Sequence, residues 1–254
     1  AQSLERQLHF QGEILPWRTI NLRAQIKSAV TELYAQKGQQ VKANERLARL
    51  DLSDRPSRKR QAQAELSLRE AELKADLKLQ QRSLLSDNKI RTDRALLAAA
   101  KAALQQIDMD IAHTLIKAPF AGRIDQRQAE IGDVIRDGDT LFTLIDDSRM
   151  KLRFYVPQQK INQIKKDQTI SAKLMSGTDV FGKITYISQL AESATRSFQV
   201  EAEVAAKPQQ RLYLNQSASI TLNLGTEQAH FLSPALLNLA TDGSLFVKAM
   251  TADQ

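Results

Sequence analysis

The stretch GDVIRDGDTLFTLID, residues 132–146, repeats the pattern of GQQVKANERLARLD, residues 38–51. Each copy has a glycine turn, a basic residue and a strand in which apolar and polar residues alternate. One copy cannot bury its apolar face alone, so the repeat predicts a small β-sandwich built from residues 20–51 and 115–146. At a constant offset of 94 residues, the matched pairs are Val30 with Ile124, Val41 with Ile135, Lys42 with Arg136, Leu47 with Leu141, and Leu50 with Leu144.

Between the two copies the composition becomes that of a helical arm. Residues 57–113 are rich in Ala, Leu, Gln, Lys, Arg and Glu and contain neither Gly nor Pro, as expected of a helix. We predict an antiparallel helical hairpin over residues 52–114, with its reversal at 86–89; the alternative is two ordinary helices on a globular core. The seven-residue spacing of a helical seam occurs at Ile90, Leu97, Leu104 and Ile111.

The junction IKAPFAGRI, residues 116–124, returns the chain from the arm to the second copy. Pro119 is expected to keep the returning helix from continuing, because proline removes a backbone donor and clashes inside a helix. Gly122 is expected to allow a sharp turn into the strand that carries Ile124. Three further glycine turns are predicted, at Gly38, Gly132 and Gly138.

The sequence after Met150 predicts an all-β module and then a smaller one. Five or six short alternating segments are typical of a barrel or a sandwich. Residues 230–250, HFLSPALLNLATDGSLFVKAM, predict a strand, a loop, an Asp-Gly turn and a strand. Residues 4–14, LERQLHFQGEI, alternate without a partner of their own, so the two ends of the chain are expected to share a sheet.

The composition argues against several classes of site. There is no cysteine, so neither a disulfide nor a thiolate metal site is available. The formal net charge is +7, but both signs alternate along the chain and aromatic residues are few, so nucleic-acid binding is not expected. His9, His113 and His230 lie far apart, and no phosphate loop, dinucleotide fingerprint or nucleophile elbow occurs. We expect no enzyme activity, no metal and no cofactor.

Residues 113–146, HTLIKAPFAGRIDQRQAEIGDVIRDGDTLFTLID, resemble the second lipoyl half-motif of the HlyD-like membrane fusion proteins, the periplasmic adaptors of tripartite efflux pumps. ATRSFQV, residues 194–200, resembles the strand entry of that family's barrel, and SPALLNLATDGSLFV, residues 233–247, resembles the return into its membrane-proximal domain. Asn44 stands where the family pattern has a glycine after the first turn, and Asn215-Gln216 replace its Pro-Gly before the last barrel strand. Asparagine tolerates the left-handed backbone better than most residues, so both turns are expected to survive.

The resemblance implies a mainly β fold with an α-helical coiled-coil hairpin, in which the hairpin splits a lipoyl-like (barrel-sandwich hybrid) domain and a β-barrel follows. The implied parts are a partial membrane-proximal β-domain from residues 1–19 and 227–254, the lipoyl-like domain from 20–51 and 115–146, the hairpin from 52–114, and the β-barrel from 147–226.

The resemblance also implies a non-catalytic adaptor, several copies of which assemble in a pump. It is expected in the periplasm, attached to the inner membrane through an anchor or signal that is not present in this chain. Its partners would be an inner-membrane transporter, of the RND type or alternatively the ABC type, and a TolC-like outer-membrane channel. The assembly would export small molecules.

In the family, the hairpin tip has the pattern Arg-x-x-Leu, followed by an apolar residue and a serine. Arg82, Leu85 and Ile90 match this pattern and are expected to dock on the outer-membrane channel, whereas Arg91 occupies the place of the serine. The alternative for the tip is a solvated arginine beside leucines that pack the hairpin end.

Leu68 and Leu79 lie off the main seam and are the expected lateral contacts between hairpins, unless they are incidental surface leucines. Two other functions stay open. A secretion scaffold could use the same hairpin as a tether without a pump. A biotinyl or lipoyl carrier shares the half-motifs but presents a modifiable lysine on a tight turn between them, where this chain has its arm.

Overall fold

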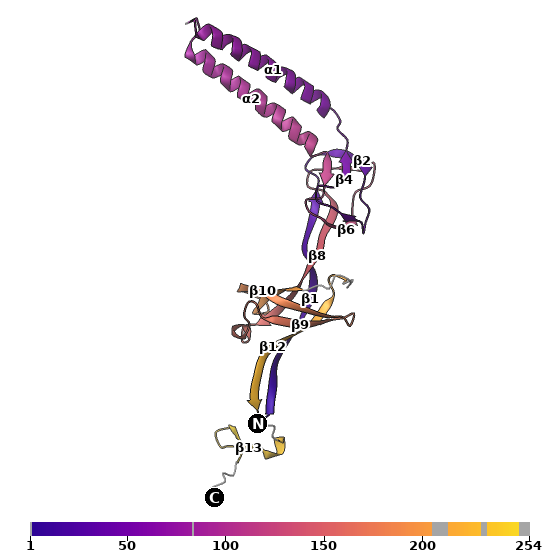
Figure 1. Ribbon diagram of the computed structural model, residues 1–254, viewed down its shortest axis with the longest axis vertical. Helices are drawn as coiled ribbons and strands as arrows, with labels where there is room; N and C mark the ends of the chain where they lie inside the picture. Colours follow the sequence, from indigo (N-terminus) through magenta and orange to yellow (C-terminus); the bar gives the residue numbers. More distant parts are fainter. Residues whose placement is uncertain (1, 83, 205–212, 230–232, 249–254) are drawn as a thin grey trace. The chain divides into compact units, whose positions relative to one another are not determined.

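The computed structural model describes residues 2–82, 84–204, 213–229 and 233–248. They form two compact units (Figure 1). The hairpin unit is Pro16–Ser148, and the barrel unit combines Ala1–Leu15 with Arg149–Gln254. Two long strands contribute to both units: β1 (Gln2–Arg23) and β8 (Thr140–Pro157). Within the described part of the chain, no helix is both long and apolar enough to span a membrane.

The hairpin unit holds both copies of the repeat and the arm between them. One of its sheets has the strand order β5-β4-β2-β7; in the other, β3 pairs with β6, and β6 pairs with the first part of β8. Strands of one copy therefore pair with strands of the other in both sheets. The elements are β2 (Ser28–Leu33), β3 (Gln40–Val41), β4 (Arg46–Leu50), α1 (Arg55–Gln80), α2 (Asp87–Ala112), β5 (Leu115–Lys117), β6 (Gly122–Arg127) and β7 (Val134–Ile135).

The core of this unit is made by the matched residues of the two copies. Val30 is 2% exposed and its counterpart Ile124 is fully buried, and both belong to one apolar cluster. Burying each such side chain stabilises the fold by about 1.5–3 kcal/mol, so each copy depends on the other for much of its stability. The predicted sandwich is confirmed. The same cluster contains the other matched apolar residues, Val41, Leu47, Leu50, Ile135, Leu141 and Leu144.

The arm ends before the proline that was expected to end it. Helix α2 stops at Ala112, and the Thr114 hydroxyl donates a hydrogen bond of 2.6 Å to the Ile111 carbonyl oxygen. The Leu50 amide donates to the Thr114 carbonyl oxygen at 2.8 Å, which starts the return into the sheet. Pro119 lies beyond β5, so the prediction that it stops the helix was wrong.

Gly122 also has a role other than the predicted one. It is the first residue of β6 and is not in the left-handed region. A Cβ atom at this position would lie 2.2 Å from the carbonyl oxygen of Ile145, so the close approach of β8 requires glycine here. The predicted turn glycines do adopt left-handed angles, as does Asn44 at a φ of 64°; the glycine φ values are 81° at Gly38, 95° at Gly132 and 89° at Gly138.

Phe120 of the junction helps to join three segments of the hairpin unit. The Arg18 guanidinium lies over the Phe120 ring, 4.2 Å from its centroid, and donates a 2.9 Å hydrogen bond to Asp146 Oδ2. Burial acts to raise the pKa of Asp146, but hydrogen bonds from Ser148 and Arg18 outweigh it, so the pKa is lowered. The carboxylate therefore stays ionised where β1, the junction and β8 meet.

The two helices of the arm have 26 residues each and lie antiparallel, side by side (Figure 1). This confirms the predicted hairpin; at a rise of 1.5 Å per residue each helix is about 39 Å long. Pro56 lies in the first turn of α1, as expected. The reversal lies at 81–86 rather than at 86–89. Ser86 is the N-cap of α2 and Asp87 the acidic residue of its first turn, so the residues after them are already helical.

The barrel unit closes into a cylinder of antiparallel strands. Its strand order is β1-β12-β9-β10-β11-β8, and β1 also pairs with β8. This closure decides between the two predicted architectures in favour of the barrel. A short 3-10 helix, η1 (Ile161–Gln163), brings Ile161 and Ile164 against the barrel core. The remaining strands are β9 (Thr169–Leu174), β10 (Asp179–Glu192), β11 (Ser197–Val204) and β12 (Ser217–Ala229).

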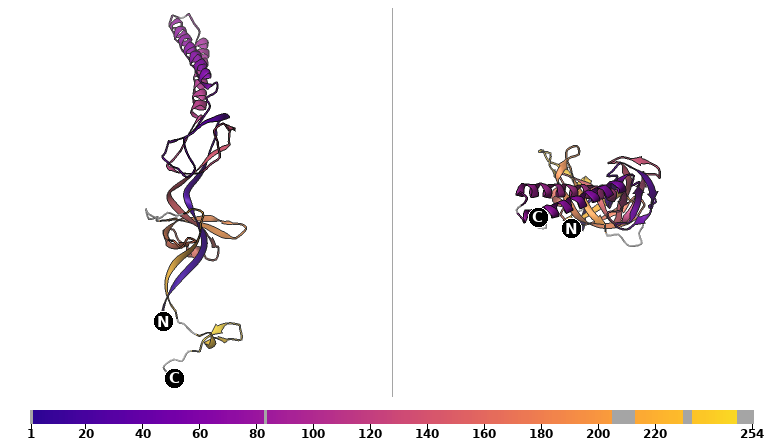
Figure 2. Two further views of the ribbon diagram at one scale, coloured as in Figure 1. Left: turned by 90° about the vertical axis from the view of Figure 1, so that its right-hand side faces the viewer. Right: turned by 90° about the horizontal axis from the view of Figure 1, so that it is seen from above.

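The first part of strand β1 lies in the barrel, which differs from the predicted domain boundaries. Residues 1–19 were assigned to the membrane-proximal domain, but Phe10 and Ile14 are buried in the barrel core, where the Phe10 ring stacks on Phe154 at 5.6 Å. β1 pairs with β12, and the two strands lie side by side (Figure 2). β12 precedes the C-terminal segment that was expected to share this sheet; the described strands of that segment, at 238–239 and 245–246, pair with each other instead. Asn215, before β12, has the expected left-handed φ, 60°.

After β12 the described chain contains η2 (Pro234–Leu236) and a small hairpin of β13 (Asn238–Leu239) and β14 (Leu245–Phe246). The Asp-Gly turn between these strands was predicted. The predicted strand at 230–232 lies outside the described residues.

The close contact at Gly122 can be tested by substitution. Gly122→Ala is expected to lower the free energy of unfolding by about 3 kcal/mol, because a new methyl group would be forced against the β8 backbone. Gly38→Ala is the matched control: it meets no atom within 4 Å and bears only left-handed strain, about 1 kcal/mol. Urea unfolding measures both, and equal losses would contradict the assignment.

Candidate functional site

The hairpin has a narrow core. Half-buried and buried positions follow the spacing of three and four residues along both helices. In α1 no residue is fully buried. In α2 four are, namely Ile90, Asp93, Ala100 and Ile107. Two helices alone enclose little volume, so most of the surface of the arm is open to partners.

The described residues of the tip, between the two helices, are 81, 82 and 84–86. The Arg82 side chain is exposed and makes no hydrogen bond or ion pair to any described residue. Leu85 is half-buried, whereas its neighbour Leu84 is 68% exposed. Gln80 Nε2 donates to Asp87 Oδ1 at 2.7 Å and so ties the two helix ends together. The tip thus presents a free guanidinium next to an exposed leucine.

Two tip residues differ from their expected roles. Ile90 was predicted to dock on the channel, but it is only 3% exposed and lies in the seam. It can support the tip but does not present a surface. Leu84, which the family pattern passed over, is the most exposed apolar side chain of the tip; the pair of adjacent leucines at a chain reversal was the available signal. Arg91, in the place of the family's serine, is exposed.

A charged bridge crosses the seam close to the tip. Lys89 Nζ, from the first turn of α2, is 3.0 Å from Asp76 Oδ2 of α1 and also contacts Asp93 Oδ1. Asp93 is 3% exposed, and its Oδ2 has no hydrogen-bond partner among the described residues. A buried carboxylate is costly unless it is paired, so Lys89 is the group that makes Asp93 tolerable at a seam position.

The bridge shifts the protonation of its members. The hydrogen bond from Lys89, followed by that of Asp93, lowers the pKa of Asp76. The hydrogen bonds to Asp93 and Asp76 raise the pKa of Lys89. Asp76 and Lys89 are therefore expected to be charged at neutral pH. The apolar spacing did not reveal this bridge, but Asp93 lies three residues after Ile90 and four before Leu97, which is a seam position.

The lateral surface of the arm has exposed apolar side chains on both helices. Leu68 and Leu79 of α1 are 49% and 37% exposed, which leaves them free for the predicted contacts between hairpins. In α2, Leu96 and Met109 are 40% and 42% exposed. Neither was among the predicted lateral contacts; the available signal was an apolar residue of α2 outside the seven-residue spacing.

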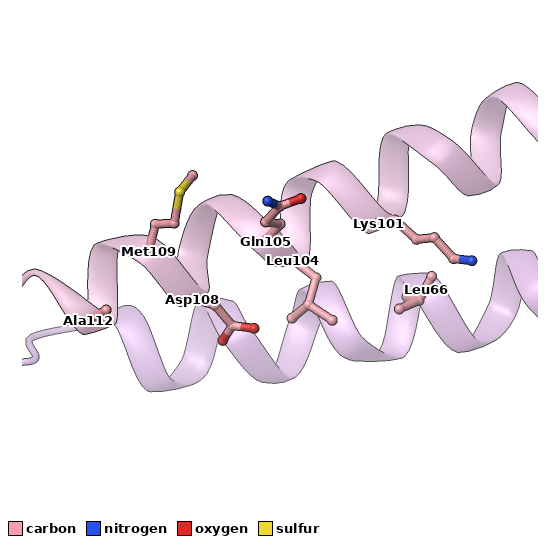
Figure 3. A pocket seen from close by; sticks show the side chains of 7 residues that line it. All are labelled: Leu66, Lys101, Leu104, Gln105, Asp108, Met109 and Ala112. Atoms are coloured by element: carbon pink, nitrogen blue, oxygen red, sulfur yellow. The ribbon is translucent and has the colours of Figure 1, made fainter.

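A shallow groove of about 400 Å³ runs along the arm near its foot (Figure 3). Leu104 points from α2 toward α1 and forms part of its floor with Leu66, whereas Met109 points away from α1. Asp108 at its border pairs with Lys59 of α1 at 2.8 Å. The groove is apolar with a charged rim, which suits packing against another helix rather than chemistry.

No group of three or more His, Cys, Asp or Glu side chains that could hold a metal ion occurs among the residues that the structure describes. The tip and the arm offer contacts: a guanidinium for a charge-assisted hydrogen bond and leucines for apolar anchors.

Two comparisons establish the fold in known proteins. A chimera of MacA and MexA, containing the Pseudomonas aeruginosa MexA α-hairpin domain, superposes with a TM-score of 0.81 at 21% identity, over 100% of this chain and 92% of that one. MacA from Actinobacillus actinomycetemcomitans gives a TM-score of 0.65 at 20% identity, over 89% of this chain and 81% of that one. In both cases the likeness covers the barrel as well as the hairpin unit.

Sequence comparison adds a curated relative and a family. The multidrug resistance protein MdtA of Klebsiella pneumoniae is 25% identical over 267 residues, which cover 95% of this chain; the chain spans 65% of the length of that relative. The family model described as "RND MFP, barrel-sandwich hybrid domain" matches residues 18–147, just over half of the chain. The chain therefore belongs to the RND membrane fusion protein family.

Proposed function

We propose that the chain is a non-catalytic periplasmic adaptor, several copies of which link an inner-membrane transporter to an outer-membrane channel. The observation that carries the proposal is the split sandwich, which holds a long hairpin whose exposed tip and sides offer contacts. Membership of a family described by its RND type favours an RND transporter over an ABC transporter. The multidrug resistance named for MdtA favours small molecules as the exported substrates.

The hairpin tip is assigned to the outer-membrane channel. Arg82 and Leu84 are exposed there and Leu85 is half-buried beside them. An unpaired guanidinium next to apolar anchors is the composition of a small hot spot for a helical partner. Inward-facing Ile90 is assigned to the support of the tip. On the arm, Leu68 and Leu79 are assigned to contacts between copies.

The Lys89 bridge is assigned to holding the tip in position. It joins the last turns of α1 to the first turn of α2 through Asp76 and Asp93. The Asp76 contribution follows the lowered pKa of this carboxyl: stability is present above its ordinary pKa and is lost as the pH falls through the lower folded value. The tip geometry is therefore expected to be best defined near neutral pH.

The C-terminal segment is assigned to the membrane-proximal domain and to the inner-membrane side. Residues 236–247 form only a two-stranded sheet, which cannot cover its own faces. Their large apolar side chains are correspondingly exposed: Leu239 by 72% and Leu245 by 65%. Uncovered apolar residues of this kind are typical of a contact surface.

The two alternatives differ in what they require. A lipoyl or biotinyl carrier needs its modified lysine on a tight turn between the half-motifs, but α1 and α2 occupy that position. A secretion scaffold without a pump uses the hairpin alone and gives the barrel and C-terminal segment no partner in the inner membrane.

The double variant Arg82→Glu/Leu85→Asp is expected to abolish export while the isolated protein stays folded, because it reverses the charge and removes an anchor at an exposed turn. Efflux is measured in cells whose own adaptor gene is deleted. Arg94→Glu/Ala98→Asp reverses one charge and adds one carboxylate at exposed positions on the side of α2, and it is expected to retain export. Unchanged efflux by the tip variant would remove the docking claim.

Lys89→Gln is expected to lower the thermal midpoint of the hairpin at neutral pH, because Asp93 loses its cation inside the seam. The loss should shrink in acid, because Asp76 no longer pairs with Lys89 once the pH falls through the lowered pKa of this carboxyl. Circular dichroism at the two pH values measures both effects. Lys74→Gln, at an exposed position of α1, is the control. A drop that is the same at both pH values would argue against the bridge.

Photocrosslinkers placed at Leu239 and at Leu190, a barrel residue 83% exposed, are expected to capture an inner-membrane transporter in cells. The same group at Leu68 should capture a second copy of the chain or the outer-membrane channel, but not the transporter. Mass spectrometry of the products identifies the partners. If crosslinks form only from the hairpin, the secretion scaffold becomes the better assignment.

A further inference from the structure

A groove at the foot of the hairpin combines cations with apolar side chains. Its volume is about 370 Å³, and none of the residues that line it is acidic. Three positive charges and apolar walls suit a partner that presents carboxylates together with aliphatic side chains. The lining residues used below are Tyr34, Arg46, Arg49, Leu52, Leu115 and Lys117.

Two of the cations lie directly opposite each other. Arg46 of β4 and Lys117 of β5 are partners in the antiparallel register, so their side chains share one face of the sheet. Both are exposed, and within the described ranges neither makes a hydrogen bond or an ion pair. Like charges opposite each other destabilise a strand pair. Nothing described within one copy offsets the repulsion between the Arg46 and Lys117 side chains, whereas the carboxylates of an acidic partner would offset it.

The third cation of the groove is only weakly neutralised. Arg49 lies 3.8 Å from Glu32, and that carboxylate already accepts a 2.6 Å hydrogen bond from the Tyr34 hydroxyl. Such an exposed, long ion pair contributes little. The groove therefore keeps an excess of positive charge.

The other edge of the same sheet has the complementary chemistry. In the order β5-β4-β2-β7, the groove lies at the β5 edge and β7 forms the opposite edge. Ile131 and Val134 are 64% and 68% exposed there. The segment around them, residues 130–137, has a net charge of −2: its cation is Arg136, and its carboxylates are Glu130, Asp133 and Asp137. Glu130 pairs with Arg127 at 2.7 Å, whereas the Asp137 carboxylate makes no hydrogen bond or ion pair to a described residue.

We propose that the β7 edge of one copy, residues 130–137, docks into the basic groove of the next copy. The two surfaces differ and lie on opposite edges of one sheet, so the contact is heterologous. Repeated from copy to copy, it builds a ring or a filament rather than a twofold dimer. The inference rests on the proposed assembly of several copies and names the surfaces that make it.

Cysteine crosslinking tests this contact in the full chain, which has no cysteine of its own. With a short bismaleimide, Lys117→Cys/Asp137→Cys is expected to give a ladder of covalent dimers, trimers and larger species, and each single-cysteine variant only monomers. Lys117→Cys/Glu70→Cys moves the second thiol to an exposed position of α1 and should give no ladder. Dimers from one single-cysteine variant would indicate a twofold contact and overturn the proposal.

A charge exchange separates this contact from the rest of the function. Arg46→Glu/Lys117→Glu is expected to reduce the amount of assembled species, measured by sedimentation velocity, about tenfold. Adding Val134→Arg/Asp137→Arg to the same chain is expected to restore those species. Lys165→Glu/Lys166→Glu removes the same charge from the barrel unit and should assemble normally. If the exchange does not restore assembly, the inference fails. If the groove variant assembles fully yet supports export, the adaptor function stands and only this contact is refuted.

Discussion

The structure depends on the apolar core that the two copies of the repeat build together. Val30 and Ile124 come from segments separated by the whole hairpin, and both are buried in the same cluster. Since neither copy can bury its apolar face alone, the feet of the arm are held side by side as a condition of folding. The hairpin is thereby fixed to a domain that it interrupts, and its length becomes available for contacts far from that domain.

The two-helix arm and the closed barrel differ in how much of their apolar surface is exposed. The barrel buries its apolar residues in a closed core, whereas the two helices leave leucines and a methionine exposed along their sides. The core of the arm contains a buried carboxylate, which is unfavourable by itself: Asp93 occupies a seam position and is stabilised by its ion pair with Lys89. A hydrophobic residue there would pack better, but a bridged charge defines which turns of the helices face each other. Defined geometry is the more useful property near the tip if, as we propose, the tip docks on a partner.

Most of the fold was predictable because its signals are local or periodic. The repeat at a fixed offset, the heptad spacing and the Asp-Gly turn each follow from residues a few positions apart. Some of the wrong predictions concern contacts between distant segments, and others concern local caps that the sequence pattern did not single out. Gly122 was assigned to a turn, but glycine is required there because the backbone of Ile145 passes close to it. Gly122 and Ile145 are far apart in the sequence, so no local pattern indicates this contact. Pro119 was assigned to helix termination, but the helix has already ended at Ala112, where hydrogen bonds of Thr114 turn the chain toward the sheet.

Alternation and heptad spacing specify which face of each element must be buried, so the split sandwich, the arm and the pairing of matched residues follow from the amino-acid order alone. The same order places Arg82 and Leu85 at the tip. The tertiary structure was needed to show that Ile90 faces inward, that β1 helps to close the barrel, and that Lys89 joins two carboxylates across the seam. It alone placed Arg46 opposite Lys117, because strand register is set by the packing of the whole domain and not by either strand.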